Sequence, residues 1–265
     1  MSEIILVTGS GRSGTSLVMH LINKAGIRLS EQLTKPSKFN PDGAFEDVRI
    51  LKAQRRLLKG LTEGYYRLRP SNWGAGEINH REYDEIRDIV KENLEEARGL
   101  KWGVKAPYAS QLMPLWHQIA SELNCALKVV FCTRRAESVV TSLVMHYGYS
   151  LERAEAVYFN RHLEFFADLK GDAYVVRYEE IKGSPGEILP SLFDYCGLPS
   201  EKGNAEEVLE LIKPSYDRAS IGQVCDIHAH VRALSEKMEE ASGLVQDDSE
   251  LSVWCREERN KYSKC

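Results

Sequence analysis

The sequence predicts an α/β fold, with a mainly parallel central sheet flanked by helices. Short apolar runs typical of buried strands alternate with longer segments whose apolar residues recur at helical spacing. The first apolar run also leads through closely spaced glycines directly into a helical pattern. This alternation implies βαβ units with right-handed crossovers, and such sheets bind ligands at the carboxyl ends of their strands.

The chain of 265 residues can bury a full core, and no repeat, low-complexity tract or long linker divides it. We therefore expect a single domain over residues 1–265, with a helical insertion at about 47–100. The net charge of -4 gives no reason to expect a nucleic-acid partner. An anion site must instead be a local concentration of basic groups.

The six cysteines form no CxxC pair and no zinc-binding spacing, so we expect them to be reduced and structural. The apolar run near the N-terminus is too brief for a signal peptide or for a membrane span of about 20 residues. These observations predict a cytoplasmic protein without a membrane span.

The first half of the chain begins with a strand, a glycine loop and a helix that ends at Gly26. A turn-rich segment then predicts a surface loop over 35–43. The remaining elements expected here are a strand over 4–7, a short strand over 26–29, and amphipathic helices over 48–61 and 81–98.

The second half alternates strands and helices more clearly, and its apolar run over 126–132 is the strongest strand pattern in the chain. A further helix is expected to start at Ser184 and Pro185, where Pro190 should kink it or delay its onset. The other expected elements are strands over 102–104 and 173–176, and helices over 112–123, 136–146, 151–168, 205–213 and 229–241.

The glycine loop follows the first strand and predicts a phosphate site. Glycines let the backbone turn tightly, and the N–H groups at the start of the next helix attract an anion. Gly9-x4-Gly14 matches P-loop spacing and predicts a P-loop nucleotide-kinase-like arrangement, but Thr15 stands where nucleotide-hydrolysing P-loops carry lysine. The loop should therefore hold phosphate in a different way.

A second anion-binding candidate follows the strand over 126–132. Arg134 stands where that strand ends, and Ser142 lies eight residues later, on the same face of the expected helix. An arginine can present a planar fork of donors to a phosphate, and the serine can add a hydroxyl. The alternative is an arginine that simply solvates a strand end.

Together the two motifs resemble those of sulfotransferases that use 3'-phosphoadenosine 5'-phosphosulfate (PAPS) as donor. The family's first motif, G-x-x-R-S-G-T followed by Thr or Ser, corresponds to residues 9–16, and its second, Arg with Ser eight residues later, to Arg134 and Ser142. The resemblance implies that Arg134 and Ser142 bind the 3'-phosphate. It also implies that the 5'-phosphosulfate is bound by Gly11, Arg12, Ser13, Gly14, Thr15 and Ser16.

Weaker features of the family recur in the same order at residues 40–46, 104–107 and 177–199, so the resemblance spans residues 4–199. The cytosolic branch of the family carries K-T-H-x-P, with the histidine as base, where this chain has Lys105-Ala106-Pro107. The resemblance is therefore to the bacterial and Golgi-type branch. Tyr178 would lie close to the adenine, and Arg218 would belong to a late basic segment that closes over the donor.

Sulfuryl transfer requires a cation at the leaving oxygen and a base at the acceptor. Arg12 is the expected cation, Lys105 could assist it, and Glu46 is the expected base. Lys105 could instead be a solvated lysine, and Glu46 could cap the helix that starts at Val48. His146 and His20 are the alternative bases.

Two further groups could contribute to an acceptor site. The basic side of the first insertion helix could attract an anionic acceptor or be a solvated helix face, and three aromatic residues could form an acceptor wall or core. The two groups are Lys52, Arg55, Arg56 and Lys59, and Tyr65, Tyr66 and Trp73.

The predicted activity is sulfuryl transfer from PAPS to a hydroxyl or amine of a small-molecule, carbohydrate or lipid acceptor, with adenosine 3',5'-bisphosphate as product and no metal. The helical insertion at 47–100 would form the acceptor side. Two alternatives remain: a P-loop kinase of a small molecule, and a non-catalytic nucleotide-binding protein of the same fold.

Overall fold

A five-stranded sheet forms the centre of the computed structural model, which describes residues 2–37, 40, 43–62, 67–70, 72–74, 78, 80–98, 101–199 and 226–262. The strand order is β2-β1-β3-β4-β5; β1 to β4 run parallel, and β5 pairs antiparallel with β4. The strands are β1 (Glu3–Gly9), β2 (Lys101–Lys105), β3 (Ala126–Thr133), β4 (Asp172–Arg177) and β5 (Gly243–Gln246). The predicted α/β fold with a mainly parallel central sheet is confirmed.

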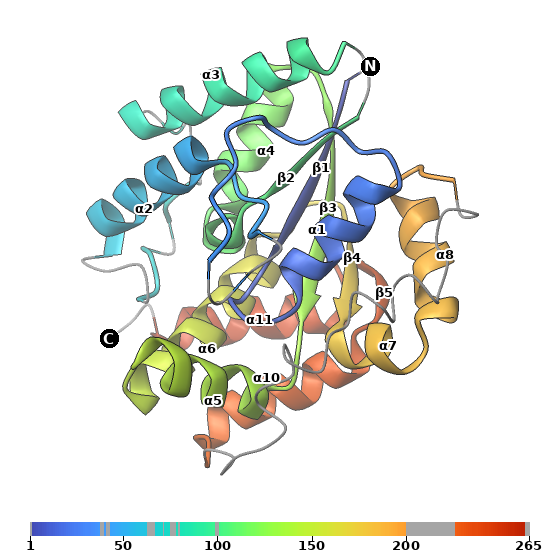
Figure 1. Cartoon of the computed structure of the whole chain (residues 1–265). Helices are drawn as coiled ribbons and strands as arrows, with labels where there is room; N and C mark the ends of the chain where they lie inside the picture. Colours follow the sequence, from blue (N-terminus) through green and yellow to red (C-terminus); the bar gives the residue numbers. More distant parts are fainter. Residues whose placement is uncertain are drawn as a thin grey trace.

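Helices cover both faces of this sheet, and α2 and α3 pack side by side in the upper left of Figure 1. The helices are α1 (Thr15–Lys24), α2 (Val48–Thr62), α3 (Arg81–Glu96), the 3-10 helix η1 (Pro107–Gln111), α4 (Met113–Glu122), α5 (Ala136–Tyr147), α6 (Leu151–Asp168), α7 (Tyr178–Gly183), α8 (Pro185–Tyr195), α10 (Ala229–Glu240) and α11 (Glu250–Tyr262). None of these described helices is long and apolar enough to cross a membrane.

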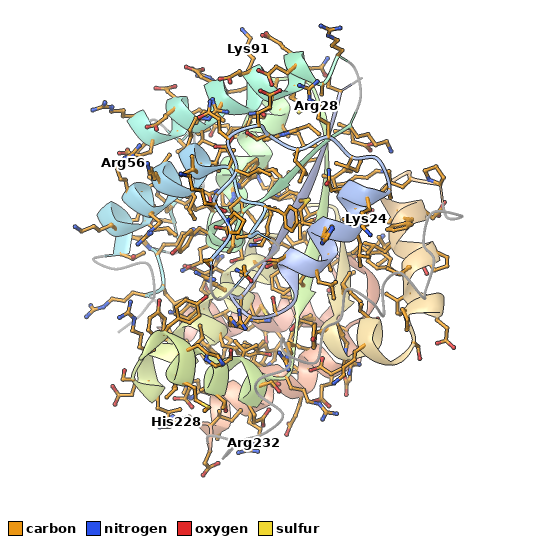
Figure 2. All side chains as sticks on the ribbon, in the orientation of Figure 1. Lys24, Arg28, Arg56, Lys91, His228 and Arg232 are labelled. Carbon is orange, nitrogen blue, oxygen red and sulfur yellow. The ribbon has the colours of Figure 1, made fainter. Side chains whose placement is uncertain are left out.

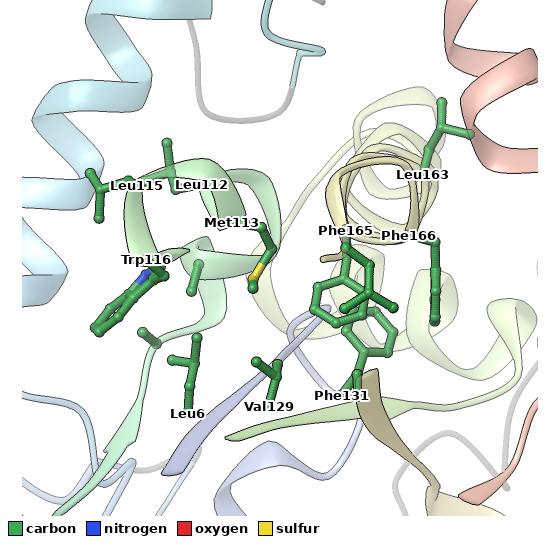
Figure 3. Close-up of a cluster of buried hydrophobic side chains, with 14 of the residues drawn as sticks. Leu6, Leu112, Met113, Leu115, Trp116, Val129, Phe131, Leu163, Phe165 and Phe166 are labelled. Carbon is green, nitrogen blue, oxygen red and sulfur yellow. The ribbon is translucent and has the colours of Figure 1, made fainter. Parts of the chain in front are cut away.

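Two apolar cores lie on opposite faces of the sheet, because successive side chains of a strand point to opposite sides. Leu6 and Phe131 face the larger core, where Phe131 stacks on Phe165 of α6 with 4.2 Å between ring centroids (Figure 3). Ile5 and Val7 face the smaller core with α1 and α8. Every residue of β1 from Ile4 to Gly9 is therefore buried.

The register of the sheet brings three strand ends together. Val7 of β1 is paired with Lys105 of β2 on one side and with Val130 of β3 on the other. Thr8 also donates a hydrogen bond to the carbonyl of Ala106, at 2.9 Å. The segments that follow β2, β1 and β3 therefore leave the same edge of the sheet.

Several predicted elements differ from the structure. The segment 26–29 makes only one parallel bridge, from Arg28 to Trp102, and no strand. Pro190 lies inside α8 without delaying its onset; it is exposed, so the carbonyl that lacks a donor can be solvated. Three elements have no signal in the sequence: α7, the polar α11, and β5, whose four residues include one buried side chain. The helix expected over 205–213 lies outside the described residues.

Candidate active site

A cavity opens at this edge of the sheet and contains residues of both predicted motifs. Residues from several separate segments of the chain line it, so its extent suits a ligand larger than a single ion. Its walls come from the β1–α1 loop, from the segment before α2, and from the residues that follow β2, β3 and β4. The lining residues are Gly11, Arg12, Gly14, Thr15, Ser16, Leu17, His20, Asn40, Gly43, Phe45, Glu46, Lys105, Pro107, Arg134, Tyr147 and Tyr178.

The β1–α1 loop needs its glycines. Gly9 has φ 141°, and a Cβ there would lie 2.2 Å from the carbonyl oxygen of Cys132. Gly14 has φ 92°, and a Cβ there would lie 2.9 Å from Cδ2 of Tyr178. Ser13 closes the turn by donating a 2.6 Å hydrogen bond to the carbonyl of Ser10. Because Gly14 has no side chain to cap α1, the first N–H groups of that helix remain available for an anion.

Arg12 joins the two motifs. Its Nε donates a 3.0 Å hydrogen bond to Oγ of Ser142, a residue 130 positions later on α5. Arg12 also has φ 71°, in the left-handed region that non-glycine residues rarely adopt outside functional turns. The loop conformation therefore directs the guanidinium toward the second motif.

Arg134 and Tyr178 lie together on the other side of the loop. The Arg134 guanidinium carbon is 4.4 Å from the centroid of the Tyr178 ring, and Arg134 is only 9% exposed. Its Nε is 4.0 Å from Oε1 of Glu179. A buried guanidinium that lines the cavity is suited to binding a phosphate.

Glu46 and Lys105 form an ion pair, in which Lys105 Nζ donates to Glu46 Oε1 at 2.6 Å. Their side chains are 15% and 4% exposed, so Lys105 is not a solvated lysine. The cap of α2 is Asp47, whose Oδ1 accepts a 2.8 Å hydrogen bond from the backbone N–H of Arg49. The alternative in which Glu46 caps this helix is therefore wrong.

An aromatic wall lies beside this ion pair. Phe45 has φ 58°, and its ring centroid is 5.1 Å from that of His20. Leu17 and Tyr147 also line the cavity, whereas His146 does not. Sequence reasoning missed Tyr147, although its place five residues after Ser142, on the same helix, was an available signal. The cavity thus combines cations with an apolar side.

The basic side of α2 does not contribute to the cavity. Its four cationic residues are exposed; Figure 2 labels Arg56 on the outer side of α2. Arg56 forms an ion pair with Glu85 of α3. Trp73 packs against the large core and against the guanidinium of Arg69. The cationic residues of α2 are thus solvated and Trp73 is packed, while Tyr65, Tyr66 and Arg218 lie outside the described residues.

The position of the missing P-loop lysine is filled by Thr15, which is 5% exposed at the start of α1. Within the part of the chain that the structure describes, no group of three or more His, Cys, Asp or Glu side chains is placed to hold a metal ion. Eleven of the twelve predicted site residues lie in the described ranges; Arg218 alone of them does not.

No family model and no curated protein matches this chain. The solved structures that are similar to it include three sulfotransferases. A sulfotransferase domain from the curacin biosynthetic pathway is 17% identical, with a TM-score of 0.43, over 95% of this chain and 89% of that one. A sulfotransferase domain from the olefin synthase of Synechococcus PCC 7002 is 16% identical, with a TM-score of 0.48, over 98% and 94%. A sulfotransferase of Mycobacterium tuberculosis is 15% identical, with a TM-score of 0.42, over 91% and 76%.

Proposed function

We propose that this protein transfers a sulfuryl group from PAPS to a hydroxyl or amine of an acceptor molecule. The hydrogen bond between Arg12 and Ser142 carries this proposal, because it joins the loop and the second motif at one cavity. A P-loop kinase would need a lysine where the chain has the buried Thr15.

The residues present fit the donor. The N–H groups at the start of α1 and the Arg12 guanidinium would hold the phosphosulfate end. Arg134 and Ser142, which are 9% and 3% exposed, would hold the 3'-phosphate. The ring of Tyr178, already stacked under the Arg134 guanidinium, would lie near the adenine.

The chemistry needs one proton acceptor and at least one cation. The bond between sulfur and the bridging oxygen of the donor breaks, and the electron pair stays with adenosine 3',5'-bisphosphate. A bond forms between sulfur and the acceptor oxygen or nitrogen, whose proton passes to a carboxylate oxygen of Glu46. Arg12 neutralises charge on the leaving oxygen, and Lys105 holds Glu46 in place at 2.6 Å.

The acceptor side favours a molecule with an apolar or aromatic part. Phe45, Leu17, Pro107 and Tyr147 all line the cavity together with Glu46. A hydroxyl or amine attached to such a body would be able to reach the carboxylate while its apolar part packs on the wall. Small-molecule, lipid and carbohydrate acceptors that present an apolar face meet this condition.

Ligand binding tests the donor site directly. Adenosine 3',5'-bisphosphate should raise the Tm of the wild-type protein, and Arg12→Ala or Arg134→Ala should remove most of that rise. Arg135→Ala is the matched control, because Arg135 adjoins Arg134 but is 60% exposed and does not line the cavity. A wild-type Tm that does not respond to millimolar ligand would contradict the proposal.

Turnover requires a second experiment with sulfur-labelled PAPS and a panel of aromatic, lipid and sugar acceptors. Label should reach an acceptor with the wild-type protein, and Glu46→Gln should slow transfer by at least about 100-fold while the bisphosphate still binds. Binding without transfer to any acceptor would favour the non-catalytic alternative. ATP binding that depends on Mg²⁺ would favour the kinase.

A further inference from the structure

Arg161 on α6 is a buried cation that neither sequence motif includes. It is 6% exposed, and its Nε is buried without a hydrogen-bond partner. Across the described ranges, no carboxylate forms an ion pair with it. Its one described partner is the ring of Tyr108 in η1, whose centroid is 4.8 Å from the guanidinium carbon.

A second buried arginine shows how this fold normally compensates such a charge. Arg69 has a fully buried side chain, pairs with Asp168, and lies 3.9 Å from Glu164. It also donates hydrogen bonds to the carbonyls of Gln111 and Trp73, at 2.8 and 2.9 Å. Burial of a guanidinium is therefore balanced here by carboxylates, and Arg161 differs from this pattern.

Arg161 lies next to the phosphate loop. Its Nη1 lies 3.7 Å from the place where a Cβ on Gly11 would be, so it borders the tip of the phosphate loop. Gly11 also lines the cavity. A guanidinium keeps its proton under all physiological conditions, so a buried one needs an anion nearby. Because Gly11 has no side chain, the Arg161 guanidinium faces the loop backbone directly.

We infer that Arg161 binds the oxyanion held by the loop, as a second arginine beside Arg12. The inference rests on the proposed function for the identity of that oxyanion, which is the phosphosulfate end of the donor and the 5'-phosphate of the product. Arg161 approaches the loop from α6, whereas Arg12 is held by Ser142 of α5. Two arginines from different directions would surround the anion, and the ring of Tyr108 would hold the second one in place.

The ligand-free Tm and the nucleotide affinity of two arginine variants test this inference. Arg161→Met removes a charge that has no described counter-ion, so the ligand-free Tm should stay unchanged or rise. The same variant should bind adenosine 5'-monophosphate about tenfold more weakly or worse, because a charge-assisted hydrogen bond to phosphate is lost. Binding of adenosine 3'-monophosphate should change little, since Arg134 and Ser142 remain. Arg69→Met, the control, should lower the ligand-free Tm.

Arg161→Lys keeps the charge and should retain part of the affinity for the 5'-monophosphate, which also covers the case in which the methionine variant does not fold. Equal affinity of wild type and both variants for the 5'-monophosphate would overturn the inference. If the wild type binds neither nucleotide, the donor assignment has failed, and inorganic sulfate becomes the probe. Stabilisation by sulfate that is weaker in Arg161→Met would still support the site, and equal stabilisation would refute it.

Discussion

The ion pair between Lys105 and Glu46 gives the sharpest quantitative prediction. Among the described residues, Glu46 is the only carboxylate paired with Lys105, whose side chain is 4% exposed. Glu46 is 15% exposed and faces the cavity, where water can reach it. The buried Lys105 ammonium therefore needs the Glu46 carboxylate more than the water-accessible carboxylate needs Lys105.

The expected magnitudes follow from this inequality. Removal of one partner of a fully buried pair costs about 3–5 kcal/mol. Glu46→Gln leaves the Lys105 ammonium without a counter-charge but with an amide oxygen to accept its hydrogen bond, so we expect a loss of about 2–3 kcal/mol in unfolding free energy. Lys105→Met leaves a carboxylate that cavity water can solvate, so we expect a loss of about 1–2 kcal/mol.

The double variant, Glu46→Gln with Lys105→Met, should be more stable than Glu46→Gln alone, because no uncompensated charge remains. Urea denaturation of the four proteins at pH 7 measures the coupling energy, which should exceed the loss in Lys105→Met alone and be about 2–3 kcal/mol. The same cycle on Arg56 and Glu85, whose side chains are 50% and 38% exposed, should give less than about 0.5 kcal/mol. Additive losses at Glu46 and Lys105 would refute the reasoning.

Three further predictions concern the loop and the large core. Gly14→Ala should abolish binding of adenosine 3',5'-bisphosphate in a calorimetric titration, since a Cβ would meet the Tyr178 ring at 2.9 Å and the backbone has φ 92°; normal binding would contradict the loop geometry. Ser142→Ala should weaken binding of the same ligand about 3- to 10-fold, because the Arg12 guanidinium loses its hydrogen-bond acceptor; unchanged affinity would exclude that role. Burial lowers the pKa of His162 to about 4; the hydrogen bond with the carbonyl of Tyr158 opposes this shift, and the charge of Arg161 adds to it slightly. Between pH 6.5 and about 4, His162 is protonated in the unfolded protein but neutral in the folded protein. The contribution of the neutral His162 to the unfolding free energy is therefore complete above pH 6.5 and is lost as the pH falls through that window. The stability difference between wild type and His162→Gln should shrink accordingly in urea titrations at pH 7.5 and 5, and a constant difference would contradict the assignment.

The parts of the site next to strands could be predicted from the sequence. The loop over 9–14 follows an apolar run, and Arg134 follows another, so both had to lie at carboxyl ends of parallel strands. Ser142, eight residues after Arg134, lies on α5, the helix that follows this strand. Local pattern therefore identified the residues that the structure brings together around the cavity.

The roles of Glu46 and Lys105 could not be separated from their alternatives in the same way. Glu46 and Asp47 are adjacent carboxylates before a helix, and which of them caps α2 depends on a hydrogen bond that Glu46 makes to a lysine 59 residues later. Helix propensity and residue spacing concern neighbours in the chain, whereas the contact between Glu46 and Lys105 depends on how the strands pair. Lys105 is the last residue of β2, which lies beside β1 in the sheet, and this position brings its side chain to Glu46.

Arg161 was missed for a related reason. Its segment has the pattern of an amphipathic helix, in which an arginine normally lies in water. In the structure α6 is enclosed by the sheet, by η1 and by α11, whose residue Arg259 pairs with Asp168 at 2.7 Å. The sequence carried no signal for α11, so the extent to which α6 is covered could not be foreseen.

The order of the strands has a consequence for how this protein can change over evolutionary time. The proposed donor contacts come from segments that follow β1, β3 and β4, whereas the proposed acceptor contacts include the end of the edge strand β2 and the segment before α2, together with Leu17 of α1 and Tyr147 of α5. The described residues between α1 and β2 supply Phe45 and Glu46 to the cavity and belong to none of the strands β1, β3 and β4. This segment can therefore diversify, and with it the choice of acceptor, while the nucleotide-binding half of the sheet keeps its register and its chemistry.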